Sequence, residues 1–316
     1  MTPASVTIVS FDKCIRMTKK FDAIIVGGGP AGLSAALILG RCRRRVLICD
    51  GGEPRNAASH ALHGFLTRDG IPPAELLRIA REQLEPYDVM IRESHVVNVD
   101  RSELGFEVSL SDGSHLRARK LLLATGLTDR IPNIEGLKPL YGKSVFHCPF
   151  CDGWEMRDQP LAVYGRGNHG STLAMTLKTW SDDVVLCSDG PSRMSRAERK
   201  RLSRHGIEIC DARIARLESD DAVLKEIVFV TGNRIARRAL FLGLGVGQRS
   251  DLAEKLGCSY TEKGGVRTYK LAKTGIPGLF AAGDALREVQ LAIVAAAEGV
   301  KAAFAINTEL QGEERP

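Results

Sequence analysis

The chain of 316 residues is poor in aromatic side chains, which make up 5% of it. Its formal net charge is only +6, and its densest basic run, Arg41 to Arg45, follows an apolar, helix-like stretch. Basic residues at the C-terminal end of a helix complement the helix dipole. Because no aromatic platform accompanies them, they do not indicate a nucleic-acid surface, and we expect no nucleic-acid partner.

Long apolar runs are also absent. No run approaches the roughly 18 residues that would suggest a membrane span, so we expect no membrane partner. The apolar patch from Val6 to Phe11 is broken by Asp12 and Lys13, which makes it too short and wrongly flanked for a secretory signal. We therefore interpret residues 1–20 as an N-terminal extension.

Cysteine is present, but not in the arrangement of a zinc site or of a disulfide-rich domain. Six of the eight Cys are scattered, at positions 14, 42, 49, 187, 210 and 258. A structural zinc site needs a second pair of Cys or His ligands, so we expect no metal. The irregular spacing is typical of a reducing compartment and predicts a cytoplasmic protein.

The most informative stretch is the remaining Cys pair, in the sequence CPFCDG at 148–153. Two thiols three positions apart can close a small disulfide ring and reopen it, and Asp152 places a proton donor or acceptor beside them. Half of a zinc site and a pair of buried core thiols are the alternatives. The proline and glycine around the pair are typical of a turn that enters a helix, so we predict a redox-active dithiol at Cys148 and Cys151.

The N-terminal part carries a strand, a glycine turn, a helix and a second strand. The apolar run from Phe21 to Val26 predicts a buried strand. The turn GGGPAG (27–32) follows, then a helix-like stretch from Leu33 to Leu39 and an apolar run from Arg45 to Cys49 that ends at Asp50. This order is the complete dinucleotide-binding fingerprint, in which the acid after the second strand accepts a hydrogen bond from a ribose hydroxyl.

The glycines of this turn have separable roles. We expect Gly27 to allow the tight turn, Gly29 to let the backbone approach a pyrophosphate, and Gly32 to let the helix pack close to the strand. A purely structural glycine turn is the alternative. The strands and the acid in their places favour nucleotide binding over it.

A hairpin signal follows in the middle of the N-terminal part. Strands are predicted from Gly105 to Leu110 and from Leu116 to Ala124, on either side of the turn SDGS (111–114). The second strand runs into ATG (124–126), where small residues let a ligand lie against the backbone. Close packing explains the same small residues equally well.

The fingerprint repeats 138 residues later, counting from Gly27 to Gly165. Residues 161–187 have the order strand, glycine loop (165–170), helix and strand, so the chain holds two Rossmann-like units. A strand that ends in Gly283-Asp284 and the Ala-rich helix after it return to the first unit.

We predict an α/β fold of two Rossmann-like three-layer domains, one inserted into the other. The first domain comprises residues 21–127 and 248–316. The inserted domain spans 128–247 and begins at the proline-containing, linker-like residues 128–132.

Five motifs occur in an order and spacing that resemble the low-molecular-weight thioredoxin reductase family of flavoproteins. They are GGGPAG (27–32), ATG (124–126), CPFCDG (148–153), the second glycine loop (165–170) and AAGD (281–284). The resemblance covers residues 21 to about 310. It implies an FAD domain interrupted by a pyridine-nucleotide-type domain that carries the redox Cys pair, and it implies a homodimer.

The roles known in this family carry over to the matching positions. The resemblance implies that Cys151 exchanges electrons with FAD, that Cys148 reacts with the substrate sulfur, and that Asp152 is the acid/base. The FAD-binding positions that it implies are Gly27, Gly29, Pro30, Ala31, Gly32, Asp50, Ala124, Thr125, Gly126, Gly283, Asp284, Gln290 and Leu291.

One departure from the family bears on the second cofactor. NADPH-using reductases have a basic cluster after the second strand of the inserted domain, whereas Asp189 stands here and would repel a 2′-phosphate. Arg166 and His169 also place bulky or charged side chains in the glycine loop. The sequence therefore argues against NADPH and leaves NAD(P)H a doubtful cofactor, although Arg193 and Arg196 follow closely and could compensate.

A branch of the family shares more of this pattern. The gliotoxin- and holomycin-type dithiol oxidases have Cys-Pro-aromatic-Cys-Asp-Gly and an Arg-Asn pair after the first acid, here Arg55-Asn56. These enzymes form disulfides in small natural products and return electrons from FAD to oxygen without NADPH. His60, His63 and His147 could each tune a thiolate, although a structural role is the commoner one for a histidine.

Three functions remain open at this point. The first is an FAD-dependent dithiol oxidase with a small-molecule dithiol and O2 as partners. The second is an NAD(P)H-dependent thioredoxin reductase that acts on a thioredoxin-like protein. The third, a non-catalytic flavin-binding redox sensor, is disfavoured by the intact Cys-x-x-Cys-Asp, and Asp189 separates the first two.

Overall fold

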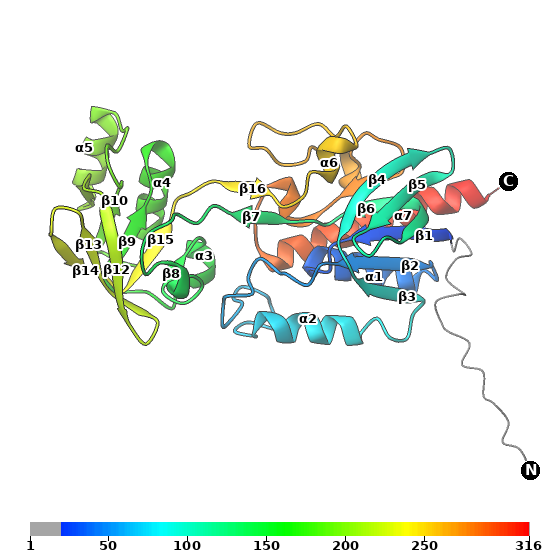
Figure 1. The fold of residues 1–316 in the computed structure, drawn as a ribbon, viewed down its shortest axis with the longest axis horizontal. Helices are drawn as coiled ribbons and strands as arrows, with labels where there is room; N and C mark the ends of the chain where they lie inside the picture. Colours follow the sequence, from blue (N-terminus) through cyan, green and yellow to red (C-terminus); the bar gives the residue numbers. More distant parts are fainter. Residues whose placement is uncertain (1–19, 316) are drawn as a thin grey trace, which may run out of the picture.

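The computed structural model describes residues 20–315 and shows two α/β domains joined by two antiparallel linker strands (Figure 1). The predicted extension at residues 1–20 lies outside the described residues except for Lys20, which already belongs to the first strand. Within residues 20–315, no helix is long and apolar enough to cross a membrane.

The first domain is built on a mixed seven-stranded sheet. Its strands are β1 (Lys20–Val26), β2 (Val46–Asp50), β3 (Val89–Glu93), β4 (Val96–Ser102), β5 (Gly105–Leu110), β6 (His115–Leu123) and β17 (Leu279–Ala281). They run in the order β3-β2-β1-β6-β5-β4, and β17 pairs with β6. The pairs among β3, β2, β1, β6 and β17 are parallel, whereas β4, β5 and β6 form an antiparallel meander. Near-continuous apolar runs such as that of β1 fit parallel strands that are buried on both faces.

The long helices cover one face of this sheet, and the meander with one short helix covers the other. The helical segments are α1 (Pro30–Arg41), α2 (Pro73–Glu82), α6 (Leu252–Lys255), η3 (Lys270–Ala272), η4 (Gly283–Leu286) and α7 (Ala292–Glu314). A Cβ on Gly299 of α7 would lie 2.0 Å from the carbonyl oxygen of Ala31 in α1, so these two helices pack backbone to backbone. One apolar core cluster lies on the side of α1 and α7, and a second lies under β4, β5 and α6.

The inserted domain repeats this three-layer plan. Its parallel sheet has the order β11-β10-β9-β15-β8, formed by β8 (Val145–Phe146), β9 (Leu161–Tyr164), β10 (Val184–Cys187), β11 (Glu208–Cys210) and β15 (Ala239–Leu242). The helical segments are η2 (Lys138–Leu140), α3 (Pro149–Asp152), α4 (Gly167–Leu177) and α5 (Arg196–Arg204). The meander on the opposite face consists of β12 (Ile214–Asp220), β13 (Val223–Phe229) and β14 (Arg234–Ala236). Separate apolar clusters fill the helical and the meander side.

Two short strands connect the domains. β7 (Leu127–Asp129) leaves the first domain and β16 (Val246–Gln248) returns to it, and the two pair antiparallel. The predicted domain boundaries, at 127/128 and 247/248, fall inside these strands. In Figure 1 they span the gap between the two domains, so the relative orientation of the domains depends on what else holds them together.

The predicted fold class, two Rossmann-like three-layer α/β domains, is confirmed. The predicted starts of two helices were too late. α1 begins at Pro30, three residues before the predicted start at Leu33, and α4 begins at Gly167, four residues before the predicted start at Ser171. In both cases the first helical turn contains the glycines of the loop, which hides it in the sequence. The sequence analysis had also missed α2, α5 and the meander β12 to β14.

Candidate active site

A large cleft opens at the carboxyl ends of β1, β2 and β6. Its volume is about 2360 Å³, against the roughly 300–1,000 Å³ of ordinary small-molecule pockets, so it has room for an extended cofactor. Of the thirteen predicted cofactor-binding residues, all but Gly32 line this cleft. The lining ones are Gly27, Gly29, Pro30, Ala31, Asp50, Ala124, Thr125, Gly126, Gly283, Asp284, Gln290 and Leu291.

The first glycine turn has no room for side chains where the chain folds back, and open space where it meets the cleft. Gly27 has a φ of +113°, and a Cβ there would lie 2.2 Å from the carbonyl oxygen of Ala124. A Cβ on Gly32 would lie 1.9 Å from the carbonyl oxygen of Gly27, so α1 packs directly on the turn. A Cβ on Gly29 would meet nothing within 4 Å. The cleft therefore reaches the backbone at Gly29, as a bound pyrophosphate requires.

The start of α1 is suited to an anion. Gly29 is its N-cap and contributes no side-chain cap, so N–H groups of the first turn are left for a ligand. Asp50 lies beside the turn, and its Oδ2 accepts a hydrogen bond from Arg81 at 2.6 Å. Its Oδ1 accepts only a long bond of 3.3 Å from the Gly52 N–H and keeps capacity for a ribose hydroxyl.

The opposite wall is built from η4 and the start of α7. The N–H of Gly283 donates to the buried carboxylate of Glu298 at 2.7 Å, which ties η4 to α7. α7 begins after Leu291 without a side-chain cap, so this long helix also presents its positive end to the cleft. An uncapped helix end on each wall, an acid at the ribose position and the length of the cleft fit FAD.

The Cys pair approaches the same cleft from the inserted domain. Cys148 is the N-cap of α3 and Cys151 lies within it, and the two are joined in a disulfide with an S–S distance of 2.02 Å. Cys151 and Asp152 line the cleft, whereas Cys148 does not. The structure thus brings one of the two sulfurs and the predicted acid/base to the cofactor cleft.

The carboxyl of Asp152 is set up to exchange a proton near neutral pH. Burial, and then the negative charge of Glu155, raise the pKa of Asp152 to about 7, against a smaller opposing influence of His63. His63 comes from the first domain, and its Nε2 lies 3.5 Å from the Glu155 carboxylate. Of the three histidines singled out in the sequence, His63 lies near Glu155 and Asp152, and His60 is exposed.

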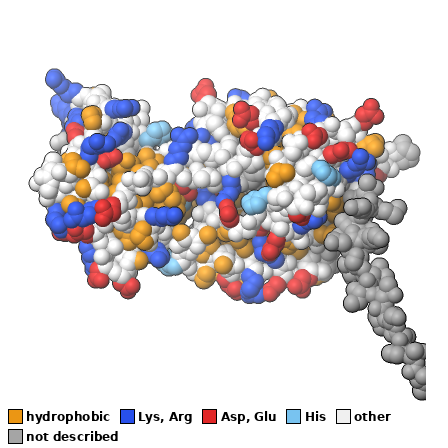
Figure 2. All heavy atoms as spheres, in the orientation of Figure 1, with side chains coloured by type: hydrophobic (Ala, Val, Ile, Leu, Met, Phe, Trp, Pro, Cys, Tyr) orange, Lys and Arg blue, Asp and Glu red, His pale blue; other side chains and the backbone are white. Residues whose placement is uncertain are grey.

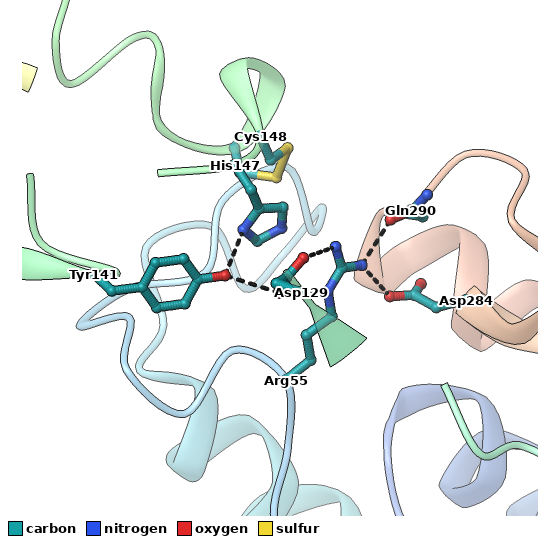
Figure 3. The surroundings of a disulfide bond; sticks show 8 residues. Arg55, Asp129, Tyr141, His147, Cys148, Asp284 and Gln290 are labelled. Atoms are coloured by element: carbon teal, nitrogen blue, oxygen red, sulfur yellow. Dashed lines mark hydrogen bonds and ion pairs between the residues drawn. A yellow bond between two sulfur atoms is a disulfide. The ribbon is translucent and has the colours of Figure 1, made fainter. Parts of the chain in front are cut away.

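The third histidine, His147, belongs to a buried network that Figure 3 shows beside the disulfide. The hydroxyl of Tyr141 lies 3.2 Å from His147 Nδ1 and donates to Asp129 Oδ2 at 2.8 Å. Asp129 also receives two hydrogen bonds from the guanidinium of Arg55, at 2.5 and 2.9 Å. Burial lowers the pKa of His147 against the opposing charge of Asp129, so this histidine stays neutral at pH 7.

The same guanidinium reaches the other wall of the FAD cleft. Nη1 of Arg55 donates to Asp284 Oδ2 at 2.8 Å and to Gln290 Oε1 at 2.7 Å (Figure 3). Burial alone would lower the pKa of Arg55, but the hydrogen bonds and charges of Asp129 and Asp284 raise it above its ordinary value. Arg55 therefore remains a cation shared by both domains.

The second glycine loop, in contrast to the first, is closed by the side chain of Arg166, one of its own residues. Nε of Arg166 donates to the carbonyl oxygen of Ser188 at 2.6 Å, and Nη2 donates to that of Asp189. The N–H of Gly167, the second glycine of the fingerprint, donates to the carbonyl oxygen of Ser192 at 2.8 Å. The backbone group that would face a pyrophosphate is already used.

Asp189 does not point a free carboxylate at a ribose. Its Oδ1 accepts from the N–H of Ile214 at 2.8 Å, and its Oδ2 accepts from the Tyr164 hydroxyl at 3.0 Å. Figure 2 shows Lys and Arg side chains gathered over α5 next to this region. Within that group Arg199 is already paired with Asp211 at 2.6 Å.

Sequence reasoning had missed several residues of the site. Tyr141, Glu155 and Arg81 carry no motif, and they become visible only when separate segments are brought together. Arg55 had been noted only as part of an Arg-Asn pair and Asp129 only as linker. In residues 20–315, no group of three or more His, Cys, Asp or Glu is placed to hold a metal ion.

Comparisons with known proteins agree with this geometry. Residues 21–299 match the family model described as pyridine nucleotide-disulphide oxidoreductase. The chain is 30% identical to a probable thioredoxin reductase of Arthroderma benhamiae, over 93% of this chain and 81% of that protein. It is similar to the crystal structure of a putative thioredoxin reductase TrxB from Bacillus anthracis, with a TM-score of 0.88 and 34% identity over 93% and 100% of the two chains.

A further solved structure, that of HlmI, superposes with a TM-score of 0.90 and is 35% identical, over 94% of this chain and 95% of that chain. The resemblance stated from the motifs is thus confirmed over most of the chain. The protein belongs to the pyridine nucleotide-disulphide oxidoreductase family, and it is a thioredoxin reductase-like flavoprotein oxidoreductase with FAD as its cofactor.

Proposed function

We propose that this protein is an FAD-dependent dithiol oxidase, which forms a disulfide in a small-molecule dithiol and passes the electrons to oxygen. The observation that carries the proposal is the Arg166 bridge across the second glycine loop. A reductase must admit NADPH at this loop, whereas here the guanidinium and the Gly167 N–H are bonded within the protein. Anaerobic reduction of the flavin by dithiothreitol, NADPH and NADH, compared side by side, tests the proposal.

The Cys pair takes two electrons from the substrate by thiol–disulfide exchange. The first substrate thiolate attacks Cys148 Sγ, the Cys148–Cys151 bond breaks, and Cys151 leaves as a thiolate. The second substrate thiolate attacks the substrate sulfur of this mixed disulfide, which closes the substrate disulfide and releases Cys148 as a thiolate. When bound, FAD supplies beside Cys151 the two-electron acceptor that restores the enzyme disulfide. The net reaction is dithiol plus O2 to disulfide plus H2O2.

Asp152 is the residue placed to move the protons of this exchange. A thiol must lose its proton before it attacks, and a leaving thiolate is stabilised when it gains one. A carboxyl with a pKa of about 7 can do both at neutral pH. Its place beside the disulfide, on the cleft side of α3, assigns it the role of the base that takes the proton of the attacking substrate thiol.

Exposed aromatic side chains beside the disulfide support a small apolar substrate. Phe150, between the two Cys, is 70% exposed, and Trp154, one turn further on, is 64% exposed. Arg157 lies over the Trp154 ring with its guanidinium carbon 4.2 Å from the ring centroid. Aromatic faces and one cation next to a reactive sulfur suit a small organic dithiol.

A thioredoxin reductase is the competing function, and the names of several relatives favour it. It would need NADPH or NADH as the electron source and a protein disulfide as the acceptor. The two functions run electrons through the Cys pair in opposite directions, so the identity of the reductant separates them.

Removing either sulfur is expected to stop turnover. Cys148→Ser and Cys151→Ser should each lower oxygen consumption with dithiothreitol by at least about 100-fold, because the two sulfurs act in series. FAD absorbance should show that both variants keep the cofactor. Cys42→Ser, at an exposed Cys that does not line the cleft, is the control and should behave as wild type. Undiminished turnover of Cys151→Ser would show that electrons reach FAD by another route.

The pH dependence should report Asp152. Since the ionised carboxylate is the base, kcat/KM for dithiothreitol should rise with pH through about 7 in the wild type. In Asp152→Asn that rise should vanish and leave only the rise that comes from ionisation of the substrate thiol, at higher pH. Glu155→Gln removes a charge that raises this pKa, so its profile should shift to lower pH. An unchanged inflection near pH 7 in Asp152→Asn would exclude this role.

Reduction of the flavin should discriminate between electron donors. Under anaerobic conditions in a stopped-flow instrument, dithiothreitol should bleach the FAD absorbance quickly, whereas NADPH should do so slowly or not at all. The 2′-phosphate needs a free Arg or Lys side chain to bind it. The carboxylate of Asp189 and the internally bonded Arg166 occupy the position where such a side chain is expected. NADH is the matched control because it lacks that phosphate. Fast reduction by micromolar NADPH would favour the reductase, with Arg193 and Arg196 as the first candidates for a phosphate clamp.

We also propose that two copies associate through the outer face of α7. Ile293, Val300 and Phe304 are exposed there at helical spacing, and Phe304 is 60% exposed. Burial of this stripe against a second copy would remove apolar surface from water. Light scattering should give a dimer mass for the wild type and a monomer mass for Phe304→Glu, and a monomeric wild type at micromolar concentration would contradict the proposal.

A further inference from the structure

The connection between β2 and α2, residues 51–72, contacts the inserted domain and the outgoing linker at several separate points. We call it the clasp loop. In Figure 1 it lies at the edge of the first domain that faces α3. We propose that Arg55 of this loop is a positioning residue, which holds the inserted domain in the orientation that keeps Cys151 at the FAD cleft.

The strongest contact is the ion pair between Arg55 and Asp129. It is bidentate, with N–O distances of 2.5 and 2.9 Å, and the two side chains are only 13% and 11% exposed. Asp129 is the last residue of β7, the outgoing linker strand. Because two buried charges must stay paired, this contact fixes the direction in which the linker leaves the first domain.

The network extends from the linker to the redox segment. Tyr141 donates to Asp129 at 2.8 Å and lies 3.2 Å from His147, which directly precedes Cys148. On its other side Arg55 holds Asp284 and Gln290 in the FAD cleft (Figure 3). One guanidinium therefore links the FAD-binding wall to the segment that carries the disulfide.

Further contacts of the clasp loop lie on either side of Arg55. A Cβ on Gly142 of the inserted domain would lie 2.7 Å from the carbonyl carbon of Ala58, so the two backbones touch. His63 reaches Glu155 beyond the Cys pair, at 3.5 Å. Glu53 pairs with Arg249 after the returning linker, at 2.9 Å, although this pair is largely exposed and contributes little. The clasp loop thus contacts the outgoing linker, the residue that follows the returning linker, and the inserted domain itself.

The linkers alone would not fix the orientation. Two strands of three residues each join the domains, and relative motion is the default for domains joined in this way. An oxidase that needs no second cofactor gains from a single orientation, because Cys151 and FAD must meet in every turnover. Only this advantage of a single orientation rests on the proposed function. The positioning role of Arg55 holds whichever acceptor takes the electrons.

The test compares FAD-loaded, oxidised Arg55→Met with Arg44→Met. Arg44 is a matched control, since its side chain is 12% exposed and pairs with Glu314 at 2.7 Å inside the first domain. Small-angle X-ray scattering should show a larger maximum dimension for Arg55→Met and an unchanged profile for Arg44→Met. Arg55→Lys, which keeps the charge but not the fork, should fall between wild type and Arg55→Met.

A kinetic split should accompany the change in shape. Reduction of the Cys pair by dithiothreitol, followed by thiol trapping, should match wild type in Arg55→Met. Anaerobic flavin reduction should slow by at least about tenfold, because Cys151 is no longer held against the cleft. If Arg55 only stabilised the fold, both arginine variants would have a lower melting temperature. Their flavin reduction and their scattering profiles would then match those of the wild type.

Asp129→Asn provides a second variant in case Arg55→Met binds FAD poorly. It cuts the network at the linker and leaves the contacts of Arg55 with Asp284 and Gln290 in place. Wild-type scattering and wild-type flavin reduction in both Asp129→Asn and Arg55→Met would overturn the proposal. Fast reduction of the wild type by NADPH would instead overturn the proposed function, and the scattering comparison would be unaffected.

Discussion

The chemistry of this protein depends on one geometric constraint, that the redox sulfurs and the flavin cleft are built by different domains. Cys151 and Asp152 come from α3 of the inserted domain, whereas the cleft that they line belongs to the first domain. Only β7 and β16 join the two covalently. Contacts across the interface therefore decide whether Cys151 faces the cofactor. The buried guanidinium of Arg55 is the most heavily bonded of these contacts, and it reaches the linker and the cofactor wall at once.

The same supersecondary unit occurs twice, and its two glycine loops differ. Around Gly29 the first turn is open, and an uncapped helix end and an acid stand ready for a dinucleotide. In the second unit the N–H of Gly167 donates to the carbonyl oxygen of Ser192. The side chain of Arg166 donates to the carbonyl oxygen of Ser188, which follows β10. The second unit keeps the fold because sheet and helix packing do not require a ligand. The Cys pair follows β8, which is the edge strand of this sheet, so the second unit provides a frame for the Cys pair.

Much of the fold could be predicted from the sequence because local signals carry it. Apolar runs predicted the parallel strands β1, β2, β6, β9, β10 and β17, and the glycine fingerprints predicted both turns and the domain repeat, whereas β3, β8 and β11 were not predicted. The motif residues of the first domain, from Gly27 to Leu291, converge on one cleft because the carboxyl ends of parallel strands share one edge of a sheet. The helix α2 was not predicted although its residues are amphipathic, because it is short and, apart from Pro73, its residues are not fully buried.

The site itself was only half visible in the sequence. The Cys pair and its acid are contiguous, so their motif could be recognised. Burial and then the charge of Glu155 raise the pKa of Asp152, and the opposing influence of His63 comes from a residue of the other domain. The partners of Arg55 are separated from it by as many as 235 residues, which no local pattern encodes.

In the proposed reaction, electrons flow from a dithiol to oxygen without a pyridine nucleotide. Its most direct test is the stoichiometry of a reaction that contains only the FAD-loaded protein, dithiothreitol and air-saturated buffer. An oxygen electrode and a peroxide assay should find one O2 consumed and one H2O2 formed for each disulfide produced. Absence of oxygen uptake, with turnover appearing only when NADPH or NADH and a protein disulfide are added, would contradict the account.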